Sequence, residues 1–443
     1  MTAAPAGRLA RHLGLGSALA LVIGEVLGVG IFLTPADMAR SLGSPFWLLV
    51  VWLVMGLMAF CGALCYGELA SRFPEAGGGY VYLREAYGRA TAFMYGWKCL
   101  IVLDPGLTAA LGVGVASYVS YATGLSAGMA KGVAILCIAG IAVANVLGVR
   151  YGAGVLRGFT FLKLGLLATL ILWGFVFQLG DWSHFTPVIA QRPGSAPLPA
   201  ALAGGMVAAF FSFGGWWDAA KLAGEVRDPA RTLPRALGLG VAIVTLVYIL
   251  TSAAFLYLVP IESVASGEAF AGQAGQVLFG TAGGRIFAAI VVICVVSSMA
   301  AFMMSAPRVY YAMARDGVFP GTMAVLHPRF GTPARAIILQ AALAILLVMV
   351  GTFSQIVAYF IFVTVVFVAL TVAAVFVLRR RHPRAGGYRT PGYPLTPLVF
   401  LGLVAVLLFL LAMGNPVQAG LGVAVVALGW PVYAAAFRER NDT

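Results

Sequence analysis

Charged residues are scarce in this chain of 443 residues, where Asp, Glu, Lys and Arg together make up 10%. A soluble domain has about 25% charged residues and roughly 45–50% apolar ones. Hydrophobic residues here reach 61%, and the mean hydropathy is +0.98. This composition excludes a soluble enzyme. The 28 Phe, 16 Tyr and 8 Trp also exclude a disordered chain, because they offer far more apolar surface to bury than such a chain has. We expect the lipid bilayer to be the main solvent.

Acidic residues are fewer than basic ones, 15 against 28, which gives a net charge of +13. A positive charge can indicate nucleic-acid binding, but here the basic residues lie in short clusters between apolar runs. Membrane topology explains such clusters first. We therefore expect no nucleic-acid partner.

Cysteine and histidine are rare as well. The cysteines are odd in number and all fall in apolar runs, so they are interpreted as small core residues and not as a disulfide framework. The histidines are dispersed in termini and loops, and no phosphate loop or nucleophile motif occurs. The sequence therefore predicts no metal, no cofactor and no catalytic residue, and a membrane enzyme would need convergent groups that are not found. The residues are Cys61, Cys65, Cys99, Cys137 and Cys294, and His12, His184, His327 and His382.

Long apolar runs recur along the whole chain. A helix needs about 20 such residues to cross roughly 30 Å of hydrocarbon. The first run follows Arg8 and Arg11 and continues to Phe32 without a cleavage signal, so we expect the first helix to be retained. The prediction is an all-α integral membrane protein with 12 transmembrane helices. Their expected positions are 14–40, 46–71, 89–120, 129–148, 156–179, 200–223, 235–259, 284–314, 334–351, 355–379, 395–414 and 416–437.

The basic residues also predict an orientation. An even number of spans places both termini on one side, and most of the 28 Lys and Arg, Lys221 among them, then fall at span ends on that side. The positive-inside rule makes that side cytoplasmic. We expect a multi-pass protein of the cell inner or plasma membrane with both termini cytoplasmic. The connections 180–199 and 260–283, rich in Pro, Gly and Ala, are expected to be outer loops.

Glycines interrupt two of the expected spans. The first contains Gly28-Val29-Gly30-Ile31-Phe32 and the sixth contains Phe213-Gly214-Gly215-Trp216-Trp217, the same place in two successive five-helix units. Such a pair of broken helices points to a transporter's central site, although glycines also serve close helix packing. Free N–H groups there would bind a carboxylate and free carbonyls an ammonium group. An α-amino acid carries both groups on one carbon.

Further motifs follow in order along the chain. Tyr66 to Tyr80 reads YGELASRFPEAGGGY, Phe211 to Arg235 contains FSFGGW, GEVRDP and LPR, and Arg308 to Gly317 reads RVYYAMARDG, with Gly331-Thr332-Pro333 beyond it. Together with the first-span GVGIF, this set resembles the amino acid–polyamine–organocation (APC) transporter superfamily. The sixth span and its loop are similar to the L-type amino acid transporter branch. The resemblance covers roughly residues 14–400.

The resemblance implies a five-plus-five inverted repeat, the leucine-transporter-like fold, in a single transporter domain 1–443. Residues 14–180 would form the first repeat, 200–380 the second, and 395–437 two additional helices. The implied function is sodium-independent secondary transport of L-amino acids by alternating access, with exchange of neutral amino acids. The alternatives are a proton-coupled amino acid symporter and a transporter of cationic amino acids or polyamines. A channel is favoured less, since broken helices suit occlusion better than a continuous pore. A receptor-like binder with the same fold would look identical in sequence.

The interrupted spans supply the expected substrate site. Val29 stands where the family often has a small polar residue, so carboxylate binding would depend on backbone N–H groups. Trp217 stands where L-type members often have Asn. Phe211 occupies the family's outer-gate position, with ordinary packing as the alternative, and the loop 121–128 lacks the Cys that would link a heavy subunit by a disulfide. The expected substrate-binding residues are Gly28, Val29, Gly30, Ile31, Phe211, Phe213, Gly214, Gly215, Trp216 and Trp217.

Lys163 lies inside the fifth expected span, where a charge is costly and therefore a functional candidate. The resemblance gives it the place that sodium occupies in sodium-coupled relatives. Its ammonium group would join carbonyls near Gly24 to Ser297 and Ser298 of the eighth span. Burial disfavours a charged lysine, so the same residue could carry a coupling proton. The alternative is a side chain that extends to the inner surface.

Acidic residues inside the spans have two interpretations each. Asp104, which precedes Pro105, is either a proton or cation site or a structural group paired with Lys98 or a tyrosine. Glu25 is nearer the inner side and could face the cytoplasmic vestibule as a second such site. Glu68 and Glu225 lie at cytoplasmic ends among arginines and are expected to form structural or gating ion pairs.

Overall fold

The computed structural model describes residues 11–28, 30–147, 152–264, 267–350, 353–383, 387–414 and 416–437. This part of the chain is helical, with no strand beyond an isolated parallel bridge between Leu13 and Val226. Eleven of its helical stretches are long and apolar enough to cross a membrane, and α14 (Ala334–Val350) is a shorter apolar helix. The all-α prediction is confirmed.

Each expected span corresponds to one helix or to a few consecutive ones. In chain order these are α1 (Leu15–Val26) with α2 (Gly30–Leu42), α3 (Pro45–Arg72), α5 (Arg89–Lys98) with η1 (Cys99–Leu103) and α6 (Asp104–Thr123), α7 (Ala127–Val146), α8 (Gly152–Val176), α9 (Leu198–Phe213) with η3 (Asp218–Glu225), α10 (Pro229–Leu258), α12 (Gly283–Ser305) with α13 (Pro307–Arg315), α14, α15 (Phe353–Arg381), α16 (Leu395–Gly414), and α17 (Pro416–Ala427) with α18 (Gly429–Ala436).

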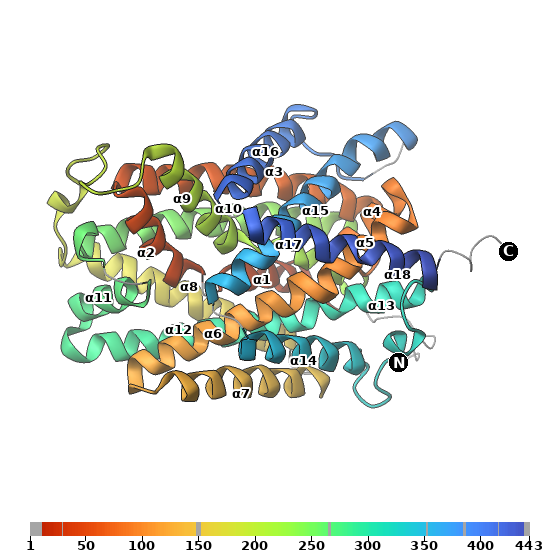
Figure 1. The fold of residues 1–443 in the computed structure, drawn as a ribbon, viewed down its shortest axis with the longest axis horizontal. Coiled ribbons are helices and arrows are strands. Elements are labelled where there is room, and N and C mark those ends of the chain that lie inside the picture. The colour runs from red at the N-terminus through yellow and green to blue at the C-terminus, as the bar shows by residue number, and fades with distance from the viewer. Residues whose placement is uncertain are drawn as a thin grey trace.

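Two further helices lie in connections. α4 (Gly79–Tyr87) follows the second span, and α11 (Gly267–Phe279) occupies much of 260–283. The connection 260–283, expected to be an outer loop, therefore contains a helix that the sequence did not predict. Figure 1 shows α4, α13 and α18 at one end of the molecule and α11 at the other. Short turns of 3-10 helix complete the structure at η2 (Trp182–Phe185), η4 (Ile261–Ser263), η5 (Gly280–Ala282) and η6 (Gly321–Ala324).

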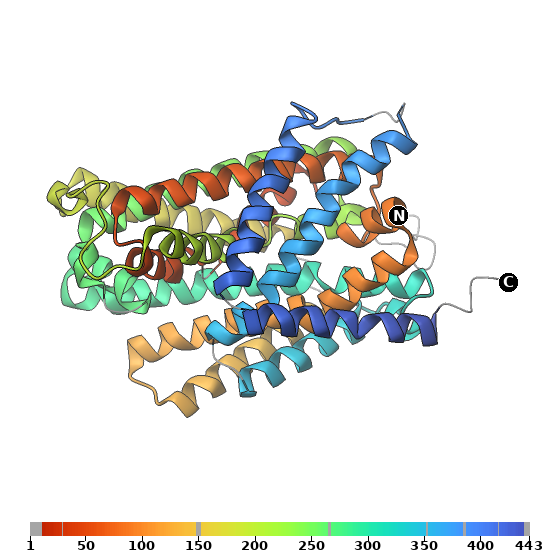
Figure 2. The same cartoon turned by 45° about the horizontal axis from the view of Figure 1, so that its top comes forward.

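The helices form two packed groups. α1 and α2 pack with α3, α9 and α10, while α6, α7, α12 and α14 pack with one another. In Figure 2, α7 and α14 lie side by side at the edge of the second group. α1 also contacts α8 and α12. The first broken span therefore lies where the two groups meet.

The third span changes its winding in the middle of the membrane. Pro105 has no N–H and its ring clashes with the carbonyl four residues earlier in a regular α-helix. The chain accommodates it with a π-helical turn, η1, immediately before Asp104. Single π-turns of this kind often occur at functional sites. Here the turn precedes a fully buried carboxylate.

The cysteines behave as the sequence predicts. All five are free, and four are buried, with Cys137 partly exposed. They contribute to packing like other small apolar side chains.

Candidate functional site

Both predicted interruptions occur in the structure. The first span loses its helical pattern between Val26 and Gly30, with Val29 itself outside the described residues. The sixth span is a series of turns over Gly214 to Trp217. Gly215 has φ 111°, a left-handed conformation that L-residues with a side chain rarely adopt. The glycine motifs therefore mark true helix breaks.

The two breaks touch one another. A Cβ added at Gly30 would lie 2.7 Å from Cα of Ser212, and one added at Gly215 would lie 3.3 Å from the carbonyl oxygen of Glu25. The Ser212 hydroxyl lies 2.6 Å from the hydroxyl of Thr34. Only a residue without a Cβ permits the approach at Gly30. Gly28 is different, since a Cβ there would meet only ordinary contacts, the nearest at 3.5 Å.

Tyr248 of α10 joins the two breaks by a hydrogen bond. Its hydroxyl lies 2.7 Å from the carbonyl oxygen of Val26, at the end of α1, and 2.8 Å from that of Ser212, near the end of α9. Both carbonyls lie in the last turn of a helix, where the regular hydrogen bond from a residue four positions later is missing. Sequence reasoning missed Tyr248 because an isolated Tyr inside an apolar span carries no motif.

The breaks also leave backbone groups for a ligand. The first N–H groups of α2, from Gly30 and Ile31 onward, have no partner within that helix, and the helix dipole makes its start positive. Such a terminus suits a carboxylate. Ile31 is fully buried.

Some aromatic side chains of the sixth span pack against neighbouring helices, and others lie at the break. Trp216 lies against α3, with its ring 5.0 Å from that of Tyr66. Phe213 also packs outward from the break, 5.2 Å from the ring of Tyr248. Trp217 stacks on Phe210 at 6.1 Å, and its buried indole N–H has no partner among the described residues.

Phe211 is 8% exposed and lies near the C-terminal end of α9, about one turn before the break. Its position suits both the gating and the packing interpretations.

Lys163 of α8 makes three hydrogen bonds, and we call this group the carbonyl site. The ammonium donates to the carbonyl oxygens of Gly24 at 3.1 Å and Leu27 at 3.2 Å, and to the Ser298 hydroxyl at 2.6 Å. The Ser298 hydroxyl lies 2.7 Å from the same Gly24 carbonyl. Lys163 is 2% exposed, so it does not extend to the surface. The predicted neighbour Ser297 takes no part, because it donates to Cys294 of its own helix.

A second buried group of charges surrounds Lys221 of η3, and we call Asp104, Asp218, Lys221 and Tyr310 the acid cluster. Lys221 Nζ lies 2.7 Å from Oδ1 of Asp218 and 3.3 Å from Oδ1 of Asp104. The Tyr310 hydroxyl donates to Oδ2 of Asp104 at 2.6 Å. The cluster joins the third, sixth and eighth spans.

The acid cluster corrects two predictions. Lys221 was assigned to a cytoplasmic span end, but its side chain is 0% exposed, because η3 turns the polar stretch after Trp217 back into the bundle. Lys98, one of the two structural partners expected as alternatives for Asp104, lies instead over the ring of Tyr95 at 4.6 Å and has no hydrogen-bond partner among the described residues. A tyrosine does bind Asp104, as the structural alternative expected.

Glu25 of α1 lies close to this cluster. The residue is 7% exposed, and neither carboxyl oxygen has a hydrogen-bond partner in the described part of the chain. The charges of Asp218 and Lys221 both act on it. Glu25 therefore faces the protein interior in this structure and not an open vestibule.

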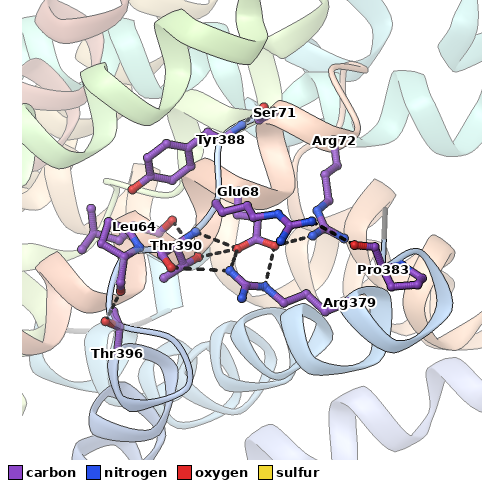
Figure 3. Close-up of polar contacts among 11 residues, drawn as sticks. Leu64, Glu68, Ser71, Arg72, Arg379, Pro383, Tyr388, Thr390 and Thr396 are labelled. Atoms are coloured by element: carbon purple, nitrogen blue, oxygen red, sulfur yellow. Dashed lines mark hydrogen bonds and ion pairs between the residues drawn. The ribbon is translucent and has the colours of Figure 1, made fainter. Parts of the chain in front are cut away.

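Glu68 forms the expected ion pair at the end of α3. Its carboxylate accepts two bonds from Arg379 of α15, at 2.9 and 2.6 Å, and pairs with Arg72 at 2.6 Å. Thr390 donates to it through its backbone N–H and its hydroxyl, each at 2.8 Å. Figure 3 shows Arg379, Arg72 and Thr390 arranged around the one carboxylate. Bidentate arginine pairing is among the stronger charged contacts, so this end of α3 is firmly tied to α15.

Two more ionic contacts lie at the same end of the molecule. Glu225 accepts a hydrogen bond from Arg308 at 2.9 Å. Arg84 of α4 pairs with Asp316, which follows α13, at 2.6 Å, and Tyr80 donates to the same carboxylate at 2.9 Å. Burial and the Asp316 charge raise the pKa of Tyr80, which keeps its hydroxyl a donor. The Glu225 pair was predicted, whereas the Arg84 pair depends on a helix, α4, that was not.

Backbone hydrogen bonds also connect segments at this end of the molecule. The backbone N–H groups of His12 and Leu13 donate to the carbonyl of Glu225, and the N–H of Arg227 donates to the carbonyl of Leu13. The residues before α1 are thereby bonded to the residues after η3.

The sequence profile described as amino acid permease matches residues 13–436 of this chain. The match includes both broken spans, the carbonyl site and the acid cluster. The chain belongs to the amino acid permease family. It is therefore a multi-pass membrane transporter of amino acids and not an enzyme, and the predicted relation to the APC superfamily and its L-type branch is confirmed.

Individual members of the family are similar over almost the whole chain. The serine/threonine exchanger SteT of Bacillus subtilis is 31% identical over 429 residues, covering 96% of both chains. The large neutral amino acids transporter small subunit 2 of Homo sapiens is 27% identical, covering 96% of this chain and 80% of that protein. The human cystine/glutamate transporter is also 27% identical, with 96% and 85% covered. These matches cover 96% of this permease and at least 80% of each of the three relatives.

Proposed function

We propose that this permease exchanges neutral L-amino acids across the cell membrane, without sodium, by alternating access. The substrate carboxylate binds the free N–H groups at the start of α2, and its ammonium group binds carbonyls released at the two breaks. Gly28, Val29, Gly30 and Ile31 form one side of this site, and Gly214, Gly215 and Trp217 the other. Phe211 closes the site from outside.

The observation that carries sodium independence is the carbonyl site. The Lys163 ammonium contacts the carbonyls of Gly24 and Leu27, and these are the oxygens at the end of α1 that a bound cation would otherwise neutralise. An ammonium with three satisfied donors supplies that charge from the protein itself. The transporter then needs no sodium ion to hold α1 against α12.

Exchange and neutral substrates are supported by the named relatives. SteT is a serine/threonine exchanger, and the human protein of similar sequence is a transporter of large neutral amino acids. The relative named as a cystine/glutamate transporter carries different substrates at comparable identity. The backbone groups at the breaks suit the part that all amino acids share, and the side-chain preference depends on residues such as Trp217.

The architecture proposed with this function is a five-plus-five inverted repeat, with residues 14–180 and 200–380 as the two units and 395–437 as additional helices. Both termini lie in the cytoplasm. Since the connection 121–128 has no cysteine, we expect the protein to work without a disulfide-linked heavy subunit.

Counterflow in proteoliposomes tests the proposal. Vesicles loaded with unlabelled serine or leucine should accumulate the labelled amino acid from sodium-free buffer, while empty vesicles should not. Uptake that requires external sodium would contradict sodium independence. Uptake into empty vesicles at the same rate would contradict exchange.

A further inference from the structure

Glu25 is in an unusual state for a carboxyl group inside a membrane protein. It is more than nine-tenths buried, and neither Oε1 nor Oε2 accepts a hydrogen bond from any described residue. An ionised carboxylate without donors is among the most costly groups to bury, whereas the neutral acid buries only a polar group. Glu68 shows the contrast, since its carboxylate has donors from Arg379, Arg72 and Thr390.

The partners of the neighbouring charged groups also favour a neutral Glu25. Three buried carboxyl groups, Glu25, Asp104 and Asp218, lie in this part of the bundle with two buried ammonium groups, Lys98 and Lys221. Asp104 and Asp218 share Lys221, and Tyr310 donates to Asp104 as well. Among the described residues, Glu25 is the one of these three carboxyl groups with neither a hydrogen bond nor an ion pair, so its ionised form is stabilised least.

We propose that Glu25 is a proton-binding site, which holds one exchangeable proton in this conformation and releases it when the two broken spans separate. A proton, unlike a metal ion, needs no further ligands and so suits a carboxyl with no second oxygen donor around it. The reaction is a simple protonation: the carboxylate gains the proton from water, and returns it to water.

The position of Glu25 connects the proton to the movement of the helices. Its carbonyl oxygen lies against Gly215, the residue with a positive φ in the sixth-span break. Water can reach the carboxyl only if α1 and η3 move apart. The titratable and charged groups that face α1 and the cluster from the packed elements are Lys163 on α8, Asp218 and Lys221 on η3, Tyr248 on α10, Cys294 on α12, Tyr310 on α13, and Lys98, Cys99 and Asp104 on the third span.

Infrared difference spectroscopy on the purified full-length protein tests the protonation directly. A protonated carboxylic acid has a carbonyl stretch that a carboxylate lacks. We expect this band at neutral pH in the wild-type protein and its complete loss in Glu25→Gln. The matched control is Glu262→Gln, the same chemical change at an exposed residue of η4, which should leave the band unchanged.

The pH dependence of stability provides a second readout, which needs no transport. A proton held by the folded protein, but lost to neutral solvent on unfolding, makes stability fall as pH rises. The melting temperature in detergent should therefore decrease between mildly acidic and mildly alkaline pH in the wild type. In Glu25→Gln, which mimics the neutral acid, that decrease should be smaller, while Glu262→Gln should behave as the wild type does.

The spectrum also decides against the proposal if it is wrong. Absence of the band from the wild type at neutral pH would overturn it, as would a band that persists in Glu25→Gln. Added sodium that raises the melting temperature while the band is missing would assign the site to a metal ion instead. If Glu25→Gln does not fold, the wild-type spectrum alone still decides whether a buried carboxylic acid exists.

The link to transport rests on the proposed function. If amino acid exchange occurs and Glu25 titrates, wild-type exchange should vary with pH and Glu25→Gln exchange should vary several-fold less. Failure of exchange with the band intact would disprove the proposed function alone. Intact exchange without the band would disprove only the proton site.

Discussion

Lys163 and Lys221 are both buried lysines, yet their surroundings differ. At the carbonyl site, Lys163 donates only to neutral oxygens, from Gly24, Leu27 and Ser298, and no described carboxylate pairs with it. In the acid cluster, Lys221 lies between two carboxylates, those of Asp104 and Asp218. One lysine thus holds the first span through its backbone, and the other holds the sixth span through charge.

The difference separates two ways of fixing a broken helix. Neutral carbonyls carry no net charge whether the lysine is present or absent, so replacing Lys163 by an apolar residue leaves no unpaired ion at the carbonyl site. Breaking the acid cluster exposes carboxylates to an apolar interior, which is costly. We therefore expect the loss of Lys163 at the carbonyl site to lower stability only slightly but to reduce transport strongly. Loss of Lys221 in the acid cluster should reduce both stability and transport.

Lys221→Met should have the largest effect on stability. It leaves Asp104 and Asp218 buried together without their cation, and removing one partner of a buried pair costs about 3–5 kcal/mol. We expect a strong loss of folded protein, measured as the monodisperse fraction and the melting temperature in detergent. The control is Lys131→Met at an exposed lysine of α7, which should be close to wild type.

The triple variant Lys221→Met, Asp104→Asn and Asp218→Asn sharpens this test. It removes both carboxylates along with the cation, so much of the lost stability should return. If Lys221→Met melts like the wild type, the acid cluster does not hold the sixth span by charge.

Gly30→Ala tests the direct contact between the spans. The new methyl group would lie 2.7 Å from Ser212 backbone and side-chain atoms, so the helices must shift. Overpacking of this kind costs about 1–3 kcal/mol. Gly28→Ala is the matched variant, because its methyl group meets only ordinary contacts. We expect a lower melting temperature for Gly30→Ala alone, and reduced substrate binding for both, measured by thermal shift with amino acid. Equal melting temperatures would show that the break can relax.

Lys163→Met should have a smaller effect on stability and a larger one on transport. It removes three hydrogen bonds but strands no charge, and we expect a net cost of about 1–2 kcal/mol. Exchange should fall at least several-fold, because α1 loses the ammonium that bonds its last carbonyls to α8 and to Ser298 of α12. The measurement is counterflow in sodium-free buffer, normalised to reconstituted protein. Unchanged exchange rates would remove Lys163 from the mechanism.

Tyr248→Phe should have the smallest effect. It deletes the hydroxyl that lies between the carbonyls of Val26 and Ser212, and one neutral hydrogen bond contributes roughly 0.5–1.5 kcal/mol. We expect a slight decrease in melting temperature. A loss as large as that of Lys221→Met would mean that neutral bonds hold the breaks as strongly as charges do.

The sequence predicts the parts of this permease that depend on composition and backbone. Apolar runs fix the spans, because lipid leaves few alternatives to a helix. Glycines locate the breaks at residues 28–30 and 214–215, and the motif resemblance gives Lys163 its partners. These features are local, or follow from the resemblance to the family.

The acid cluster could not be predicted, because it depends on how a short helix turns. Lys221 lies four residues after Trp217 in a polar stretch that ends in Glu225, which is the pattern of a cytoplasmic span end. Only the geometry of η3 brings it to Asp104, more than a hundred residues away. The π-turn before Asp104 has no distinct sequence signal beyond Pro105. Glu25 becomes informative only once its lack of donors is known.

The short bridge between Leu13 and Val226 is formed by peptide groups alone. The bonds run from His12 and Leu13 to the carbonyl of Glu225 and from Arg227 to the carbonyl of Leu13. Amino acid replacement, other than by proline, leaves every one of these donors and acceptors in place. A link of this kind is insensitive to side-chain identity, so side chains around the breaks can differ while the backbone connection between the start of the first span and the end of η3 is kept.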